Sequence, residues 1–242
     1  MKIVRTAAVL FLALTLSASL IGCQKVAESA YASSGWKKAY LDVIQKWNTD
    51  HGGDYEVRYN LAYIDDNDIP ELILFCDDDA WYAVDIYTFD KGSAQHMTVR
   101  HKDNSEDFDS PYTSPGHQGK GDYYIEKQGY VLLDSGMMGS LQTVGCKMDG
   151  YDLKECFRYD FVDVSFDESN KDPYSYELSY ADNNGKEVKV SKTVREDDDI
   201  YEISSVPEAK DLEKVFDISF SNLKDLSENT MSYEDIMAAV NN

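Results

Sequence analysis

Basic residues are scarce in this chain of 242 residues, where 23 Lys and Arg face 45 Asp and Glu and the formal net charge is −22 at pH 7. Nucleic acids are bound by Lys and Arg side chains that neutralise phosphates, and anionic lipid surfaces attract clusters of the same residues. A body this acidic is repelled by both. We therefore expect no nucleic-acid partner and no basic patch that binds a membrane.

Cysteine is also scarce, with four residues in the whole chain. Cys146 and Cys156 flank a turn signal at residues 149–150. If residues 149 and 150 form the hairpin loop, residue 143 lies opposite Cys156. Cys146 is three residues away from position 143, and this odd offset puts its side chain on the other face of the strands. Cys76 ends an apolar run and is expected in a buried strand. We expect no disulfide framework.

The signatures of several enzyme classes are missing. The chain has no HExxH, Cys-x-x-Cys or Gly-x-Ser-x-Gly motif and no phosphate-cradling Gly-rich loop with Lys. His96 and His101 are five apart in an expected strand, so they point to opposite faces and do not form one zinc site. The sequence therefore lacks the usual motifs of serine hydrolases, zinc enzymes and nucleotide-binding proteins. Paired carboxylates remain, but among 45 acids their presence discriminates nothing.

Residues 1–22 look like a bacterial lipoprotein signal peptide. A cationic start precedes an apolar run over residues 7–21, and Cys23 follows Leu-Ile-Gly. The run has about fifteen residues, whereas a membrane-spanning helix needs about twenty, which makes a transmembrane anchor the weaker alternative. We expect Cys23 to become the acylated N-terminus, carrying palmitate or a similar chain. The protein would then be anchored in the cell membrane on its extracytoplasmic face.

The rest of the chain predicts a short tether and one folded domain. Residues 23–33 show no strong periodicity and are expected to be the lipidated tether, and residues 34–242 are expected to form a single α+β domain. The domain begins with one helical face that carries two tryptophans and three further apolar or aromatic residues at i, i+4, i+7, i+8 and i+11, namely Trp36, Tyr40, Val43, Ile44 and Trp47. Aromatics at this spacing indicate core packing.

Between Tyr55 and about Val194 the pattern is that of β-strands. Short apolar and β-branched runs alternate with turns that contain Gly after Asn, Asp or another polar residue, which is typical of hairpins. These turns are at residues 90–92, 127–129, 149–150 and 183–185. The expected strands include residues 71–76, 81–89, 123–125, 130–133, 141–147 and 174–180. The simplest assembly is an antiparallel meander.

Two helices are predicted at the end of the chain. Ser205-Val-Pro-Glu208 has the form of a capping box, with Pro in the first turn, and an apolar face follows it. Ser232-Tyr-Glu-Asp235 repeats this form. The fold class predicted is α+β, an antiparallel β-meander with one N-terminal and two C-terminal packing helices.

The sharpest local motif is Tyr63-Ile-Asp-Asp-Asn-Asp-Ile-Pro-Glu-Leu72. It resembles the Asp-x-Asp-Gly-Asp-Gly-Ile-Pro-Glu-Leu motif of uncharacterised acidic, Tyr-rich surface lipoproteins of Gram-positive bacteria, and more loosely the calcium loop of FG-GAP-type repeats. The resemblance implies a calcium site in which Asp65, Asn67 and Glu71 are ligands. Tyr63 stands where the first aspartate would be, and Asp68 replaces a glycine. The alternative, which we favour, is a structural Asx turn that leads into the strand.

The resemblance extends in outline to the aromatic helix, a Tyr-Thr-Phe-Asp-x-Gly hairpin and the C-terminal Ser-Tyr-Glu-Asp-Ile helix. It implies location and architecture and brings no activity with it. Another candidate site is the long polar segment 102–121, with two prolines and three glycines. Loops of this length are functional or disordered. As a binding loop it would use Phe108, Tyr112 and His117.

These observations favour a non-enzymatic binding or interaction module, lipid-anchored at the membrane, that takes a protein or glycan ligand. They call for no cofactor, with calcium as the one metal suggested. The alternative is a carboxylate-dependent hydrolase of an extracellular polymer such as a glycan. Two acids about 5 to 10 Å apart in a cleft, at least one of them desolvated, would favour that enzyme.

Overall fold

The computed structural model describes residues 35–53, 56–77, 81–102, 112–115, 121–137, 139–163, 174–194 and 200–241. The predicted signal peptide, Cys23, Phe108 and His117 lie outside these residues. Two mainly antiparallel sheets, one N-terminal helix and two C-terminal α-helices confirm the predicted α+β class. Within the described residues, no helix combines the length and the apolar character that a membrane span requires.

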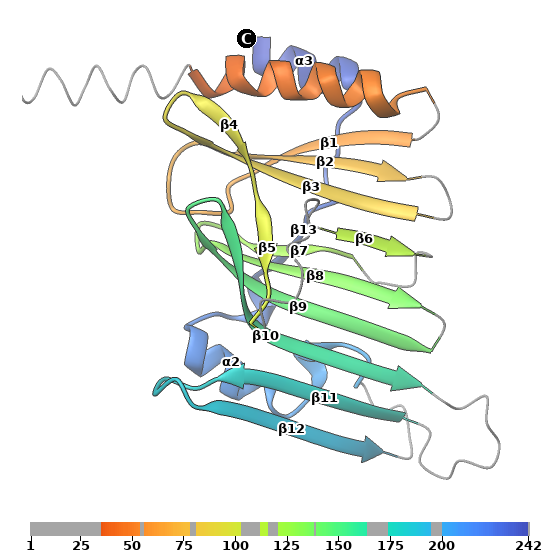
Figure 1. Cartoon of the computed structure of the whole chain (residues 1–242), viewed down its shortest axis with the longest axis vertical. Helices are drawn as coiled ribbons and strands as arrows, with labels where there is room; N and C mark the ends of the chain where they lie inside the picture. The colour runs from red at the N-terminus through yellow and green to blue at the C-terminus, as the bar shows by residue number, and fades with distance from the viewer. Residues whose placement is uncertain are drawn as a thin grey trace, which may run out of the picture.

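The N-terminal helix covers residues 35–51 and packs through the face that the aromatic spacing predicted. Tyr40 and Ile44 are fully buried, and both tryptophans pack against the same cluster. Helix α3 (Tyr233–Asn241) lies beside it (Figure 1). The predicted cap of α3 is confirmed, because the backbone N of Asp235 donates to Ser232 Oγ at 3.2 Å.

Both helices cover one face of the first sheet. Alternate residues of its central strand divide between two cores: Leu72 and Leu74 pack under the helices, and Ile73 and Phe75 face the opposite way. The sheet runs in the order β1-β2-β3-β4, and β6 also pairs with β3. Its strands are β1 (Glu56–Ala62), β2 (Glu71–Asp77), β3 (Trp81–Asp90), β4 (Ser93–His96) and β6 (Tyr112–Pro115).

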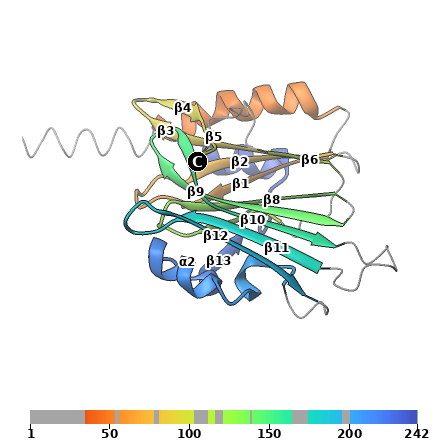
Figure 2. The same cartoon turned by 60° about the horizontal axis from the view of Figure 1, so that its bottom comes forward.

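The second sheet runs in the order β12-β11-β10-β9-β8-β7-β13, and β5 also pairs with β10. One of its faces packs against helix α2 (Ala209–Phe216) and the chain around it, and Figure 2 shows this layer on the side away from the N-terminal helix. Its strands are β5 (Thr98–Arg100), β7 (Tyr123–Ile125), β8 (Tyr130–Met137), β9 (Ser140–Asp149), β10 (Asp152–Asp163), β11 (Tyr174–Ala181), β12 (Glu187–Val194) and β13 (Leu223–Asp225).

The two sheets share a buried core and one continuous segment of chain. Ile73 and Phe75 of the first sheet belong to the same apolar cluster as Val131 and Val144 of the second. Strand β4 pairs with β3, and immediately after the buried Met97 the chain continues as β5, which pairs in parallel with β10. Figure 1 shows this segment crossing in front of the other strands. Neither the division into two sheets nor the parallel pair was predicted from the sequence.

The hairpin between β9 and β10 is shifted by one residue from its predicted position. Asp149 pairs with Asp152, so the loop is 150–151 and not 149–150. Glu155 therefore lies opposite Cys146, and a bulge at Cys156 then places Phe157 opposite Gly145. Cys146 lies in the core shared by the sheets and Cys156 packs toward α2, which confirms that the two thiols lie on opposite faces. Neither they nor Cys76 form a disulfide.

The predicted capping box at Ser205 is wrong. Ser205 ends a short 3-10 helix, η1 (Ile203–Ser205), and α2 begins at Ala209 with no side-chain cap on its first turn. The carboxylate that would have closed the box, Glu208, accepts a hydrogen bond from the hydroxyl of Tyr176 at 2.7 Å and pairs with Lys192. Contacts with the sheet therefore replace the local contact.

Candidate functional site

A cleft of about 990 Å³ opens where the two sheets meet. Five separate segments line it: the loop after β1, the β3–β4 hairpin, the β7–β8 turn, the β9–β10 hairpin and the end of α2. Ligand sites of proteins have volumes of roughly 300 to 1,000 Å³, so this cleft is at the upper end of that range. It is the candidate functional site of the protein.

Backbone hydrogen bonds join the β7–β8 turn to both of its neighbours. Lys127 N donates to the carbonyl oxygen of Tyr63 at 2.9 Å, and Gly129 N donates to that of Ile64 at 2.7 Å. On the other side, Met148 N donates to the carbonyl oxygen of Gly129 at 2.8 Å. These bonds fix the loop after β1, the turn and the β9–β10 hairpin relative to one another. The floor of the cleft is thus held by the main chain.

The loop after β1 contains two of the three predicted metal ligands, and each is engaged in the turn itself. Asp65 Oδ1 accepts from the backbone N of Asn67 at 2.9 Å, and the Asn67 side-chain amide donates to Asp65 Oδ2 at 2.6 Å. Asn67 Oδ1 in turn accepts from Ile69 N at 2.6 Å. This is the geometry of successive Asx turns. Both residues line the cleft, and burial raises the pKa of Asp65.

The third predicted ligand, Glu71, lies behind the wall of the cleft. Its side chain is buried, accepts from Ile64 N at 2.9 Å and accepts from the hydroxyl of Thr88 at 3.3 Å. Burial, followed by repulsion from Asp65, raises the pKa of Glu71 to about 7. In the described ranges no group of three or more His, Cys, Asp or Glu has the geometry of a metal site. The calcium hypothesis stays a prediction.

Tyr151 is the exposed aromatic side chain of the cleft. It is 38 % exposed, and its hydroxyl donates to Asp90 Oδ2 at 2.5 Å, which links the β9–β10 hairpin to the β3–β4 hairpin. Deeper in the cleft, Lys147 Nζ lies 4.1 Å from the centroid of the Tyr130 ring and donates to the carbonyl oxygen of Gln128. The cleft therefore presents one anchored ring over a polar floor.

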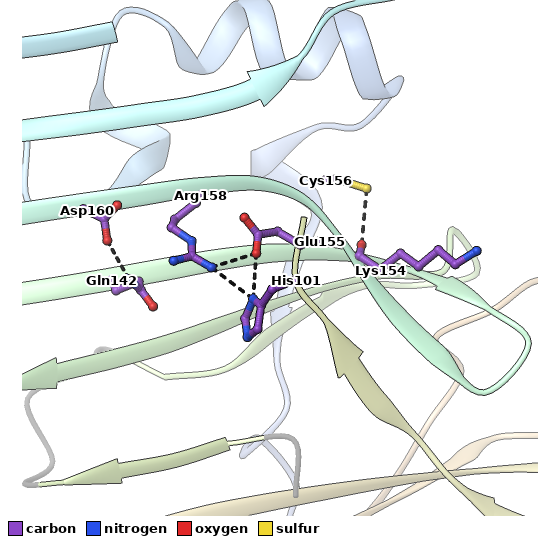
Figure 3. A network of polar contacts seen from close by, with 7 residues as sticks. All are labelled: His101, Gln142, Lys154, Glu155, Cys156, Arg158 and Asp160. Carbon is purple, nitrogen blue, oxygen red and sulfur yellow. Dashed lines mark hydrogen bonds and ion pairs between the residues drawn. The ribbon is translucent and has the colours of Figure 1, made fainter. Parts of the chain in front are cut away.

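A second polar cluster joins the end of β5 to β10 (Figure 3). Glu155 Oε2 lies 2.6 Å from His101 Nδ1 and 2.8 Å from Arg158 Nη2. A carboxylate only accepts, so Nδ1 carries a proton and Arg158, 3.0 Å from that nitrogen, donates to Glu155. His96 Nε2 lies 3.2 Å from Asp85 Oδ1 instead, so the two histidines contact different carboxylates. This cluster holds the segment shared by the sheets, and we assign it a structural role.

The predicted binding loop 102–121 contains a strand. Residues 112–115 form β6, and Tyr112 pairs with Val84 of β3. Strand β4 occupies only the other half of that edge of β3, at residues 87–90, so free backbone groups remained for β6. Tyr112 thus belongs to the first sheet, whereas Phe108 and His117 lie outside the described residues.

Most residues of the cleft were not predicted as site residues. The turns at residues 90–92, 127–129 and 149–150 were recognised as hairpin signals from their glycines, but nothing local indicates that the three turns converge on one cleft. The loop with Asp65 and Asn67 was singled out for metal binding, and its position in the wall of the cleft was not foreseen.

Comparison of the chain with protein-family models, with curated proteins and with solved structures finds no match. The assignment of function therefore depends on the geometry of the chain itself.

Proposed function

We propose that this protein is a lipid-anchored extracytoplasmic binding module whose ligand occupies the cleft between the two sheets. The observation that carries the proposal is the convergence of five separate segments on one cleft of about 990 Å³. Sites that bind small molecules are concave and few in number, with a small set of fixed polar groups. The cleft has this form, and its floor is fixed by main-chain hydrogen bonds that need no ligand.

Blocking the cleft tests the proposal. Gln128 is an exposed residue of the lining, so Gln128→Trp places a large side chain in the cleft without disturbing a core. We expect the protein to bind members of a printed panel of oligosaccharides and peptides, and Gln128→Trp to weaken that binding at least about tenfold, a loss of about 1.4 kcal/mol. Binding is detected first on the panel, and the affinities of both proteins for the probes that bind are then measured by titration calorimetry.

Asn183→Trp is the matched control, since Asn183 is exposed in the β11–β12 turn and does not line the cleft. It should bind as the unaltered protein does. Equal losses in both variants, or no probe whose binding depends on residue 128, would reject the cleft as the ligand site.

Anchoring is a separate prediction. Replacing Cys23 with Ala removes the thiol that would be acylated, and from its net charge we expect the acidic body to offer no basic patch to anionic lipid. We expect Cys23→Ala to move the protein from the membrane fraction to the soluble fraction, as followed by fractionation and immunoblotting. Tight membrane association of the variant would mean that the body has a membrane contact of its own.

One observation favours the hydrolase alternative. Asp65 lines the cleft beside Asp66, and burial raises its pKa, as a general acid requires. The companion Glu71 is buried at 1 % exposure and engaged with Ile64 and Thr88, so it does not offer a second carboxylate to a substrate. Release of new reducing ends from a bound glycan would establish hydrolysis if Asp65→Asn abolished it. The hydrolase would then replace the binding module as the proposed function.

A further inference from the structure

The charges that line the cleft differ from those of the chain as a whole. Four aspartates and three lysines line it, namely Asp65, Asp66, Asp90, Asp217, Lys91, Lys127 and Lys147. The whole chain has about two acids for each base. A cationic ligand would approach three ammonium groups and an anionic ligand four carboxylates, so neither sign of charge is favoured. A neutral ligand rich in hydrogen-bonding groups meets donors and acceptors together.

Several of these groups remain available to a ligand. The side-chain carboxylates of Asp66 and Asp217 and the side-chain amide of Gln128 take part in no hydrogen bond or ion pair within the described part of the chain, and all three residues line the cleft. Carboxylates accept from hydroxyl groups, and an amide both donates and accepts. The lysines, by contrast, are engaged: Lys127 with Asp68 and Lys91 with Asp90. The unengaged groups therefore suit a ligand that carries many hydroxyl donors.

An aromatic ring stands beside these polar groups. The hydroxyl of Tyr151 is held by Asp90, and the ring remains 38 % exposed. The face of an aromatic ring carries partial negative charge, which attracts the weakly positive C–H groups on the face of a sugar ring. Because Asp90 restrains the side chain, little conformational freedom is lost when a ligand stacks on it.

We propose that the ligand of this cleft is a neutral oligosaccharide, stacked on Tyr151 and hydrogen-bonded to Asp66, Asp217 and Gln128. This inference rests on the proposed function and names the ligand class of the same site. A cleft of about 990 Å³ takes a chain of several sugar rings more readily than one ring. Peptides and charged polysaccharides are the competing classes, and the experiment below separates them.

The test compares two substitutions of Tyr151 in the full chain. Neutral, acidic and amino oligosaccharides and acidic and basic peptides serve as probes on the printed panel. We expect neutral oligosaccharides to bind, Tyr151→Ala to weaken binding about tenfold, and Tyr151→Phe, which keeps the ring, to stay within about twofold. Affinity for a neutral ligand should not change between about 0.05 and about 0.5 M salt, whereas the affinity of a charged one falls.

The outcomes separate this inference from the proposed function. The protein could instead bind peptides or charged glycans, and Gln128→Trp could abolish that binding. This result would keep the cleft as the ligand site and overturn the assignment of a neutral oligosaccharide as its ligand. Equal losses in Tyr151→Phe and Tyr151→Ala would also overturn it, because the hydroxyl contact and not the ring would then matter. Absence of any cleft-dependent binding would reject both. Since Tyr151 lies in an exposed loop, melting curves of both variants should match the unaltered protein.

Discussion

Replacing Gly145 with Ala should destabilise the protein by about 3 kcal/mol, because overpacking a well-filled core costs roughly 1 to 3 kcal/mol and occasionally more. Gly145 of β9 lies opposite Phe157 of β10, whose ring covers the glycine. A Cβ at this position would lie well under 3.0 Å from Cζ, Cε1 and Cε2 of the ring, which is far closer than carbon atoms approach. The ring cannot move easily, since it is fully buried and packs on Phe216 and Phe220 with centroids 5.7 and 6.3 Å away.

The measurement is thermal unfolding, and a loss of this size lowers the Tm of a domain of 150 to 250 residues by about 10 °C. Gly53→Ala is the matched control, because Gly53 is exposed, has no contact within 4 Å of a built Cβ and should unfold almost as the unaltered protein does. The double variant Gly145→Ala/Phe157→Leu should recover part of the loss, since the smaller side chain makes room. A Gly145→Ala protein that melts with the unaltered one would contradict the placement of the Phe157 ring.

Replacing Asp122 with Asn should stabilise the protein at neutral pH. The side chain is 2 % exposed, its Oδ1 accepts from Asp134 N at 3.0 Å, and its Oδ2 has no hydrogen-bond partner within the described part of the chain. Burial, followed by repulsion from Asp134, raises the pKa of Asp122 well above the usual value of 3.8. An amide keeps the bond to Asp134 N and carries no charge, so the cost of ionising a buried acid disappears.

The sign of the pH dependence follows from this raised pKa. The folded protein holds the proton more tightly than the unfolded chain, so the stability contributed by Asp122 is complete below about pH 4 and is lost as the pH rises through the raised value. We expect Asp122→Asn to be more stable than the unaltered protein at pH 7, with the difference shrinking toward pH 4.

Urea titrations across this range measure the difference. Glu71, whose pKa is raised to about 7, acts in the same direction but is present in both proteins, so it cancels in the comparison. Asp42→Asn makes the same change of net charge on an exposed position of the N-terminal helix and should leave the free energy of unfolding nearly unchanged. An Asp122→Asn protein that is less stable at pH 7 would mean that the carboxylate is ionised and stabilising.

The elements that the sequence predicted correctly are those whose signal is local. The N-terminal helix followed from the spacing of Tyr40 and Ile44 along one face, and α3 followed from the cap at Ser232. Most strands followed from apolar runs between glycine turns. At Ser205 the same reasoning failed, because Glu208 is drawn to Tyr176 in the sheet and the local cap is not formed.

What the sequence could not predict depends on pairing between distant segments. A strand containing His96 was expected, but the chain there divides into β4, which pairs with the neighbouring β3, and β5, which pairs with the distant β10 of the other sheet. The bulge at Cys156 and the one-residue shift of the hairpin follow from packing on both faces of β10. The cleft has the same origin, since its five segments are separated in sequence and three of them are joined by backbone bonds such as that from Gly129 to Ile64.

The segment that runs from β4 into β5 couples the two sheets mechanically, so that they respond to force as one unit. Three residues of β5 are bonded to the second sheet while the four before Met97 are bonded to the first, and both of its buried side chains, Met97 and Val99, are part of the core between them. Force applied to either sheet is carried along this covalent connection to the other. The walls of the cleft, which belong to both sheets, are therefore tied to each other by the chain itself, and a ligand between them would meet a frame that resists being pulled open.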